Sequence, residues 1–146
     1  PGHVAAVVRW RRDLERLAAR YGQPFRKPSG FPRDSLLAAR VALVGVAEGW
    51  VAPFSRAVMS ANFAEDRDIG QAGVIAEILS RQGLDADAVI GRALSDDNKQ
   101  ALRRQTEHAT ELGLFGAPSF RVGEELFWGN DRLEDALDWA RGLQPL

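Results

Sequence analysis

A chain of 146 residues, 45% of them hydrophobic, is long enough to form a well-buried domain. Its 19 basic and 20 acidic side chains leave a formal net charge of −1, which excludes the basic field that nucleic-acid binding requires. The absence of cysteine excludes a disulfide framework and a Cys-x-x-Cys redox centre within this chain, and the interrupted apolar runs favour neither a transmembrane helix nor a secretory signal.

The first two thirds of the chain have the periodicity of amphipathic helices, with apolar residues three or four apart and polar residues between them. We expect six helices in this part of the chain. The first three run over 4–21, from a cap at Asp34 or Ser35 to about residue 48, and over 50–63. The next three lie between residues 68 and 83, over 85–94, and from cap candidates at 95–98 to about residue 113. A Pro-rich connector over 23–32 separates the first two, because prolines prevent a regular helix there.

The character of the sequence changes near residue 119. Two short runs, 119–122 and 125–128, are separated by a Gly-containing turn and predict a β-hairpin, and a final helix should run from Asp131 to about Leu143. A lone hairpin is marginal in water. Together with the start on Pro1 without an initiator methionine, this suggests that the remaining strands of the sheet precede Pro1 or come from another chain.

A first candidate site is the segment Gly116-Ala117-Pro118-Ser119. A proline directly before a strand is a place where a fold can hold a cis peptide, which would leave the N–H and C=O of Ala117 free to pair with an extended peptide ligand. The alternative is an ordinary loop with a trans proline, the commoner state of such bonds.

A second candidate is the junction of hairpin and last helix, Gly129-Asn130-Asp131-Arg132. Asp131 could hold an ammonium group, and Arg132 could bind a carboxylate in a bidentate fork. The alternative is structural, with Asp131 as the helix N-cap and Arg132 as a surface residue.

Other residues suggest less chemistry. Trp10 and Trp50 are either core residues or the walls of an aromatic substrate pocket, to which Phe31 could also contribute. His3 and His108 have no second histidine or carboxylate at ligand spacing, so we predict no metal site. No catalytic triad and no phosphate-binding loop is present.

Taken in order, these motifs resemble the 2-hydroxychromene-2-carboxylate isomerases and the related kappa-class glutathione transferases. The resemblance covers nearly the whole chain and is most specific in the last third. It is carried by residues 12–16, 21–25, 31–32, 68–69, 83–85, 115–120 and 126–133.

The resemblance implies an α/β fold that is mostly α in this chain: a thioredoxin-like domain of the DsbA-like kind with a large all-helical insertion. Residues 1–94 would form the helical insertion and 95–146 the C-terminal part of the thioredoxin-like domain. The N-terminal β-α-β unit, with the serine that faces the glutathione sulfur, would precede Pro1. No residue of this chain matches that serine, so the catalytic residue stays unassigned.

The resemblance also implies glutathione as cofactor. Ala117 and a cis Pro118 would pair with its cysteinyl backbone, and Asn130, Asp131 and Arg132 would hold its γ-glutamyl end. Asp34 stands where relatives often carry Asn, where it could place a negative charge near the substrate or cap the helix.

The implied function is glutathione-dependent isomerisation of an aromatic-ring catabolic intermediate. The resemblance further implies a cytoplasmic protein that could form a homodimer. Its expected partner is a small aromatic molecule rather than nucleic acid or a membrane. Three alternatives stay open: a kappa-type transferase, a DsbA-like dithiol–disulfide oxidoreductase, and a non-catalytic helical fragment.

Overall fold

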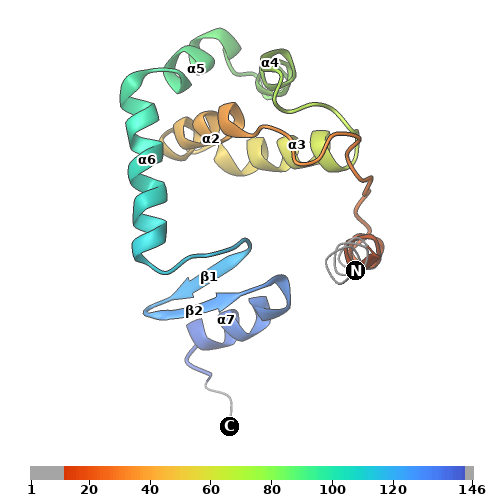
Figure 1. Ribbon diagram of the computed structural model, residues 1–146, viewed down its shortest axis with the longest axis vertical. Helices are drawn as coiled ribbons and strands as arrows, with labels where there is room; N and C mark the ends of the chain where they lie inside the picture. The colour runs from red at the N-terminus through yellow and green to blue at the C-terminus, as the bar shows by residue number, and fades with distance from the viewer. Residues whose placement is uncertain (1–11, 144–146) are drawn as a thin grey trace, which may run out of the picture. The chain divides into compact units, whose positions relative to one another are not determined.

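The computed structural model describes residues 12–143 and divides the chain into two compact units, Pro1–Leu102 and Arg103–Leu146 (Figure 1). The division falls inside helix α6 (Asp96–Glu111), whereas the resemblance placed a domain boundary between residues 94 and 95. Each unit is described separately below.

The regular elements described in the first unit are all helices, as the periodicity predicts. Residues 12–20 form the described part of the first helix, and the predicted helices at 34–48, 50–63, 68–83 and 85–94 are confirmed. Their bounds are α2 (Leu36–Glu48), α3 (Val51–Phe63), α4 (Ala72–Arg81) and α5 (Ala86–Ala93). In Figure 1, α2 and α3 lie side by side, and contacts join both to α4.

The core of this unit is formed by apolar residues from α2 to α5 and the loop before α4. Phe54 is its largest fully buried side chain, at 1% exposure, and the ring of Trp50 meets it edge-on with centroids 5.8 Å apart. The remaining core residues are Ala38, Val41, Val44, Val58, Ala61, Ile69, Ile75, Ile78, Leu79, Val89 and Ala93.

Aspartate side chains cap the N-terminal ends of two helices. Asp34 accepts a hydrogen bond from the backbone N–H of Leu36 at 2.8 Å, so of the two predicted caps, Asp34 and Ser35, it is Asp34 whose side chain serves α2. Asp85 accepts from the N–H of Ala88 at 3.1 Å and caps α5 as predicted.

The second unit contains the predicted hairpin. Strands β1 (Ser119–Val122) and β2 (Glu125–Trp128) pair antiparallel, and Gly123, with φ +62°, forms part of the turn between them. Helix α7 (Leu133–Ala140) packs on the hairpin: Ala136 is buried, and the rings of Phe127 and Trp139 lie 6.4 Å apart.

The final helix, predicted from Asp131 to about Leu143, is confirmed, but both of its ends differ in detail. Residues Asn130–Arg132 form a 3₁₀ turn, η1, because the N–H of Arg132 donates to the carbonyl of Gly129 at 3.1 Å. At the other end Gly142, with φ +77°, closes the helix after Ala140.

Within residues 12–143, none of the helices has the length and apolar character needed to cross a bilayer. Among the helices with both ends inside the described residues, α6 (Asp96–Glu111) is the longest, and none of its residues is buried. Its local support includes the ion pair between Lys99 and Asp96 at 3.0 Å.

Candidate functional site

The hairpin unit brings together the two segments that the sequence singled out near its C-terminal end. The strand register pairs Ser119 with Trp128, and one step further the N–H of Gly129 donates to the carbonyl of Pro118 at 3.0 Å. The Ala117–Pro118 peptide and the turn Asn130–Arg132 are therefore neighbours, joined by one backbone hydrogen bond.

The Ala117–Pro118 bond is cis, as the resemblance implied. Ala117 is exposed, and within residues 12–143 neither its N–H nor its C=O has a hydrogen-bond partner. An exposed peptide with both groups free is the arrangement that an extended ligand can pair with in the manner of an added strand.

Packing of aromatic rings supports the loop before Pro118. The indole of Trp128 lies over Gly116, where a Cβ atom would stand 2.5 Å from its Nε1 atom, and its ring centroid is 5.2 Å from that of Phe115. Ser119 donates a hydrogen bond to the carbonyl of Gly116. Because Trp128 leaves no space for a side chain at residue 116, only glycine fits there in this arrangement.

The turn at Gly129 exposes three polar side chains. Gly129 has φ +112° and ψ 151°, a conformation essentially reserved for glycine, and a Cβ atom there would lie 2.5 Å from Oδ1 of Asp131. Asp131 has no hydrogen-bond partner among the described residues, so the alternative in which it caps the last helix is wrong.

Arg132 has a partner on the same side of the turn. Its guanidinium donates to Asp135 at 3.0 Å, and both side chains are more than half exposed. This hydrogen bond, the charge of Asp135 and that of Asp131 raise the pKa of Arg132, which therefore stays cationic. An exposed cation beside a free carboxylate at Asp131 can receive a ligand that carries both a carboxylate and an ammonium group.

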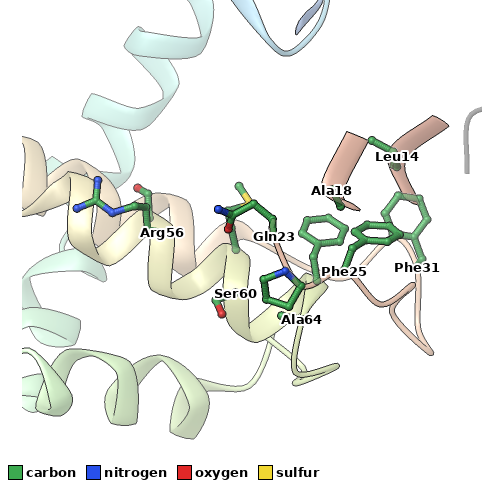
Figure 2. A pocket seen from close by; sticks show the side chains of 12 residues that line it. Leu14, Ala18, Gln23, Phe25, Phe31, Arg56, Ser60 and Ala64 are labelled. Atoms are coloured by element: carbon green, nitrogen blue, oxygen red, sulfur yellow. The ribbon is translucent and has the colours of Figure 1, made fainter. Parts of the chain in front are cut away.

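The helical unit has a separate apolar groove of about 630 Å³ (Figure 2). Its aromatic wall is formed by Phe31, one of the predicted pocket residues, and by Phe25 and Phe63, whose rings are nearly parallel with centroids 6.3 Å apart. The other lining residues are Leu14, Ala18, Gln23, Pro24, Ser55, Arg56, Met59, Ser60 and Ala64.

Trp50, another of the predicted pocket residues, does not line this groove. Trp50 packs over Gly45 at the junction of α2 and α3 and donates from its indole N–H to Glu48 at 2.8 Å. Its ring contacts the core rather than the groove. The prediction was wrong because the sequence pattern alone does not distinguish an aromatic core residue from a pocket wall. Trp10 lies outside the described residues.

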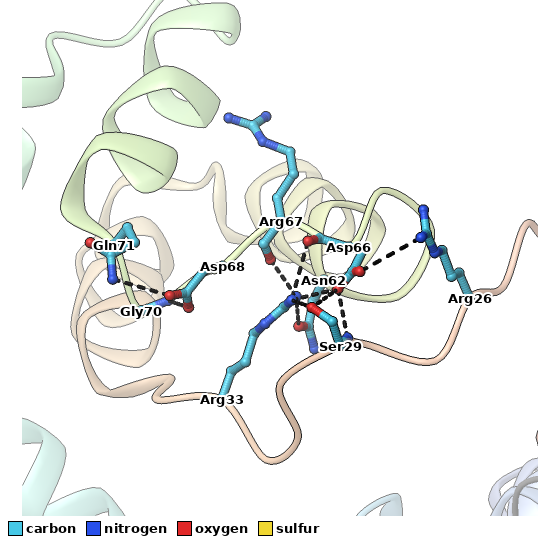
Figure 3. A network of polar contacts seen from close by, with 9 residues as sticks. All are labelled: Arg26, Ser29, Arg33, Asn62, Asp66, Arg67, Asp68, Gly70 and Gln71. Atoms are coloured by element: carbon cyan, nitrogen blue, oxygen red, sulfur yellow. Dashed lines mark hydrogen bonds and ion pairs between the residues drawn. The ribbon is translucent and has the colours of Figure 1, made fainter.

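A polar network that the sequence analysis missed holds the connector before α2 in place (Figure 3). The side chain of Arg33 is only 8% exposed, and its guanidinium donates to Asp66, to Asn62 Oδ1 at 3.0 Å and to the carbonyl of Arg67 at 2.6 Å. The same Asp66 carboxylate accepts from the backbone N–H of Ser29 at 2.8 Å. The network therefore fixes the segment that carries Phe31 against the loop after α3.

Asp66 adopts a backbone conformation that favours glycine. Among the described residues it is the only non-glycine with positive φ, at +57°. Asp tolerates this region better than most residues, and here its carboxylate receives hydrogen bonds from Ser29 and Arg33. The local sequence offers no signal for this role, because the partners are more than 30 residues apart.

Acid should weaken this network. The hydrogen bond from the Ser29 N–H, followed by that from Arg33, lowers the pKa of Asp66 below its ordinary value of 3.8. A lowered folded-state pKa stabilises the fold above the unfolded value, and this stabilisation is lost as the pH falls through the folded one. We expect urea unfolding to show a stability gap between wild type and Asp66→Asn at pH 7 that shrinks below about pH 4.

Asn is the suitable replacement because it tolerates positive φ but carries no charge. Asp68 and Asp96, whose pKa values hydrogen bonds also lower, contribute equally to both proteins and cancel in the comparison. A gap that stays constant from pH 7 to pH 3 would show that the Asp66 charge does not support the fold.

No group of three or more His, Asp or Glu side chains gathers as a metal site within residues 12–143. In the hairpin unit, the groups that could receive an organic cofactor are the free Ala117 peptide and the exposed side chains of Asp131 and Arg132.

Comparison with known proteins places this geometry in a family. Residues 6–138 match the family described as DSBA-like thioredoxin domain. A solved structure of a 2-hydroxychromene-2-carboxylate isomerase superposes with a TM-score of 0.82 at 28% sequence identity, covering 93% of this chain and 66% of that one.

Two curated proteins are similar in sequence. The 2-hydroxychromene-2-carboxylate isomerase of Sphingobium xenophagum is 33% identical over 124 residues, which cover 84% of this chain and 62% of the relative. The protein of the same name from Pseudomonas putida is 29% identical over 125 residues, 83% of this chain and 59% of the relative. The chain thus spans about three fifths of the length of these relatives.

Proposed function

The chain belongs to the family of DSBA-like thioredoxin domains, and from that membership we propose that it acts in the glutathione-dependent isomerisation of an aromatic-ring carboxylate. The relatives named 2-hydroxychromene-2-carboxylate isomerase support the reaction class. The single observation that carries the glutathione part of the proposal is the hydrogen bond from Gly129 to Pro118, which joins a free peptide to an Asp–Arg turn.

Glutathione is a tripeptide with an extended backbone, and its γ-glutamyl end carries both an ammonium and a carboxylate group. The free N–H and C=O of Ala117 suit its cysteinyl backbone, which would pair there as an added strand. Arg132 suits the γ-glutamyl carboxylate and Asp131 the ammonium group. Asn130, in the same turn, supplies an amide that can bond to either.

Bound at this site, glutathione would supply a thiolate nucleophile that is regenerated in the reaction, so the isomerisation would consume no glutathione. Ala117, Asp131 and Arg132 bind and orient the tripeptide. The residue that faces its sulfur is not assigned to this chain.

Glutathione binding tests the proposal directly. Calorimetric titration of the protein near pH 7 should give saturable binding, and Asp131→Asn or Arg132→Gln should each weaken it about tenfold, because each removes one charged partner of the γ-glutamyl end. Arg121→Gln is the matched control: Arg121 lies exposed in β1, and the substitution changes the net charge exactly as Arg132→Gln does.

Wild-type affinity in the Asp131 and Arg132 variants would remove this turn from the site, and no heat of binding with wild type would end the glutathione proposal. Turnover is measured separately, by following absorbance changes of 2-hydroxychromene-2-carboxylate with and without glutathione. A rate that does not depend on glutathione would contradict the proposed role of the thiolate.

A further inference from the structure

The groove of the helical unit has one charged side chain in an otherwise uncharged lining. Among the described residues that line it, only Arg56 carries a charge, and the lining includes three phenylalanines. We propose that Arg56 binds the carboxylate of an aromatic acid whose rings lie toward Phe25 and Phe31, so that it selects acids over neutral aromatic molecules. This inference rests on the proposed function for the identity of the substrate.

The floor of the groove is one face of α3. Arg56, Met59, Ser60 and Phe63 follow one another at the spacing i, i+3, i+4, i+7, so they form a single stripe along the helix. The stripe is about 10 Å long, two helical turns at 5.4 Å each. In Figure 2, Arg56 lies at one end of the groove with its side chain pointing away from Phe25 and Phe31, which lie toward the other end, so a cationic end is separated from an aromatic end.

Arg56 has no competing partner among the described residues. Several other arginines of this unit form ion pairs with carboxylates, among them Arg33 with Asp66 and Arg92 with Glu48, the latter at 3.0 Å. No such ion pair forms at Arg56 within residues 12–143, and its side chain extends outward on a long flexible stem. It can therefore turn onto an incoming carboxylate without breaking an existing ion pair.

The chemistry of the lining favours this ligand class. The nearly parallel rings of Phe25 and Phe63 provide flat apolar contact for fused rings. A guanidinium provides two parallel donors that match the two oxygens of a carboxylate. Within the described lining no Asp or Glu is present to receive a cationic aromatic molecule, so charge complementarity selects the acid.

Binding of a matched pair of probes tests the inference without any turnover or glutathione. The probes are 2-naphthoate and its neutral counterpart 2-naphthalenemethanol, titrated by calorimetry or by their own fluorescence. Wild type should bind the acid about three- to tenfold more tightly than the alcohol, and Arg56→Gln should abolish that preference by weakening acid binding alone. Raising the salt concentration should reduce the preference, because Arg56 is exposed.

Two further variants make the result specific. Arg104→Gln, which makes the same charge change at an exposed residue of α6, should keep the preference for the acid. Phe31→Ala should weaken both probes equally, since it removes ring contact and leaves Arg56 in place.

Equal affinity of wild type for both probes, or an unchanged preference in Arg56→Gln, would overturn the inference. Loss of the preference in Arg104→Gln as well would assign it to net charge and overturn it too. An Arg56-dependent preference in a protein that fails to isomerise 2-hydroxychromene-2-carboxylate would keep the inference and reject the proposed reaction.

Discussion

Replacing Arg33 with methionine is expected to lower the free energy of unfolding of the helical unit by about 3 kcal/mol, because Asn62 Oδ1 and the Arg67 carbonyl lose their donor at about 1–3 kcal/mol each. Methionine retains much of the apolar stem, so the loss reports on the hydrogen bonds rather than on volume. Urea unfolding followed by circular dichroism at pH 7 measures it.

Arg26→Met is the matched control. Arg26 also lies near Asp66, but at 3.9 Å and with a side chain that is 69% exposed, so its loss should cost less than about 0.5 kcal/mol. Arg33→Lys should fall between wild type and Arg33→Met, since an ammonium group keeps the charge but cannot reach all the acceptors in one plane. Equal stabilities for Arg33→Met and Arg26→Met would show that the network does not hold the connector.

Replacing Gly129 with alanine is expected to weaken glutathione binding by about ten- to hundredfold, because the backbone conformation at this position costs about 1–3 kcal/mol for any other residue. A Cβ atom would also approach Oδ1 of Asp131 to 2.5 Å. To relieve the backbone strain and this close contact, the turn must shift, and the carboxylate of Asp131 and the guanidinium of Arg132 shift with it. Calorimetric titration with glutathione gives the affinity.

Gly123→Ala provides a control with a similar backbone cost. Gly123 also has positive φ, +62°, but no atom lies within 4 Å of the position of its Cβ, and it sits at the far end of the hairpin. Its replacement should lower stability by about 1 kcal/mol and leave glutathione affinity unchanged. If Gly129→Ala bound glutathione as tightly as Gly123→Ala, the geometry of the Gly129 turn would have no part in binding.

Local patterns in the sequence were sufficient for most of the architecture. Apolar spacing predicted the helices from α2 to α6, and the Gly123 turn between two alternating runs predicted the hairpin. The 3₁₀ turn that opens the last helix was not predicted, because the spacing of apolar residues does not encode the positive φ of Gly129 before it.

Some residues of the candidate sites could likewise be predicted from the local sequence, whereas others could not. The proposed cofactor residues Ala117, Pro118 and Asn130–Arg132 could be singled out from short motifs, because a two-stranded hairpin brings the ends of its strands together. The Arg33 network could not be predicted, because two of its acceptors, Asn62 in α3 and the Arg67 carbonyl in the loop after it, lie 29 and 34 residues further along the chain. Nor could the sequence distinguish Phe31, which lines the groove, from Trp50, which packs on the core.

The position of Trp128 has a consequence for spectroscopy. Its indole is 55% exposed, yet it rests on Gly116, beside the peptide where glutathione would pair. An indole that is half in water changes its emission when a ligand displaces solvent from its face, whereas Trp50 lies in the other unit and Trp139 is packed against Phe127. The hairpin thus contains a natural fluorophore at the proposed site, and subtracting the spectrum of Trp128→Phe isolates its signal.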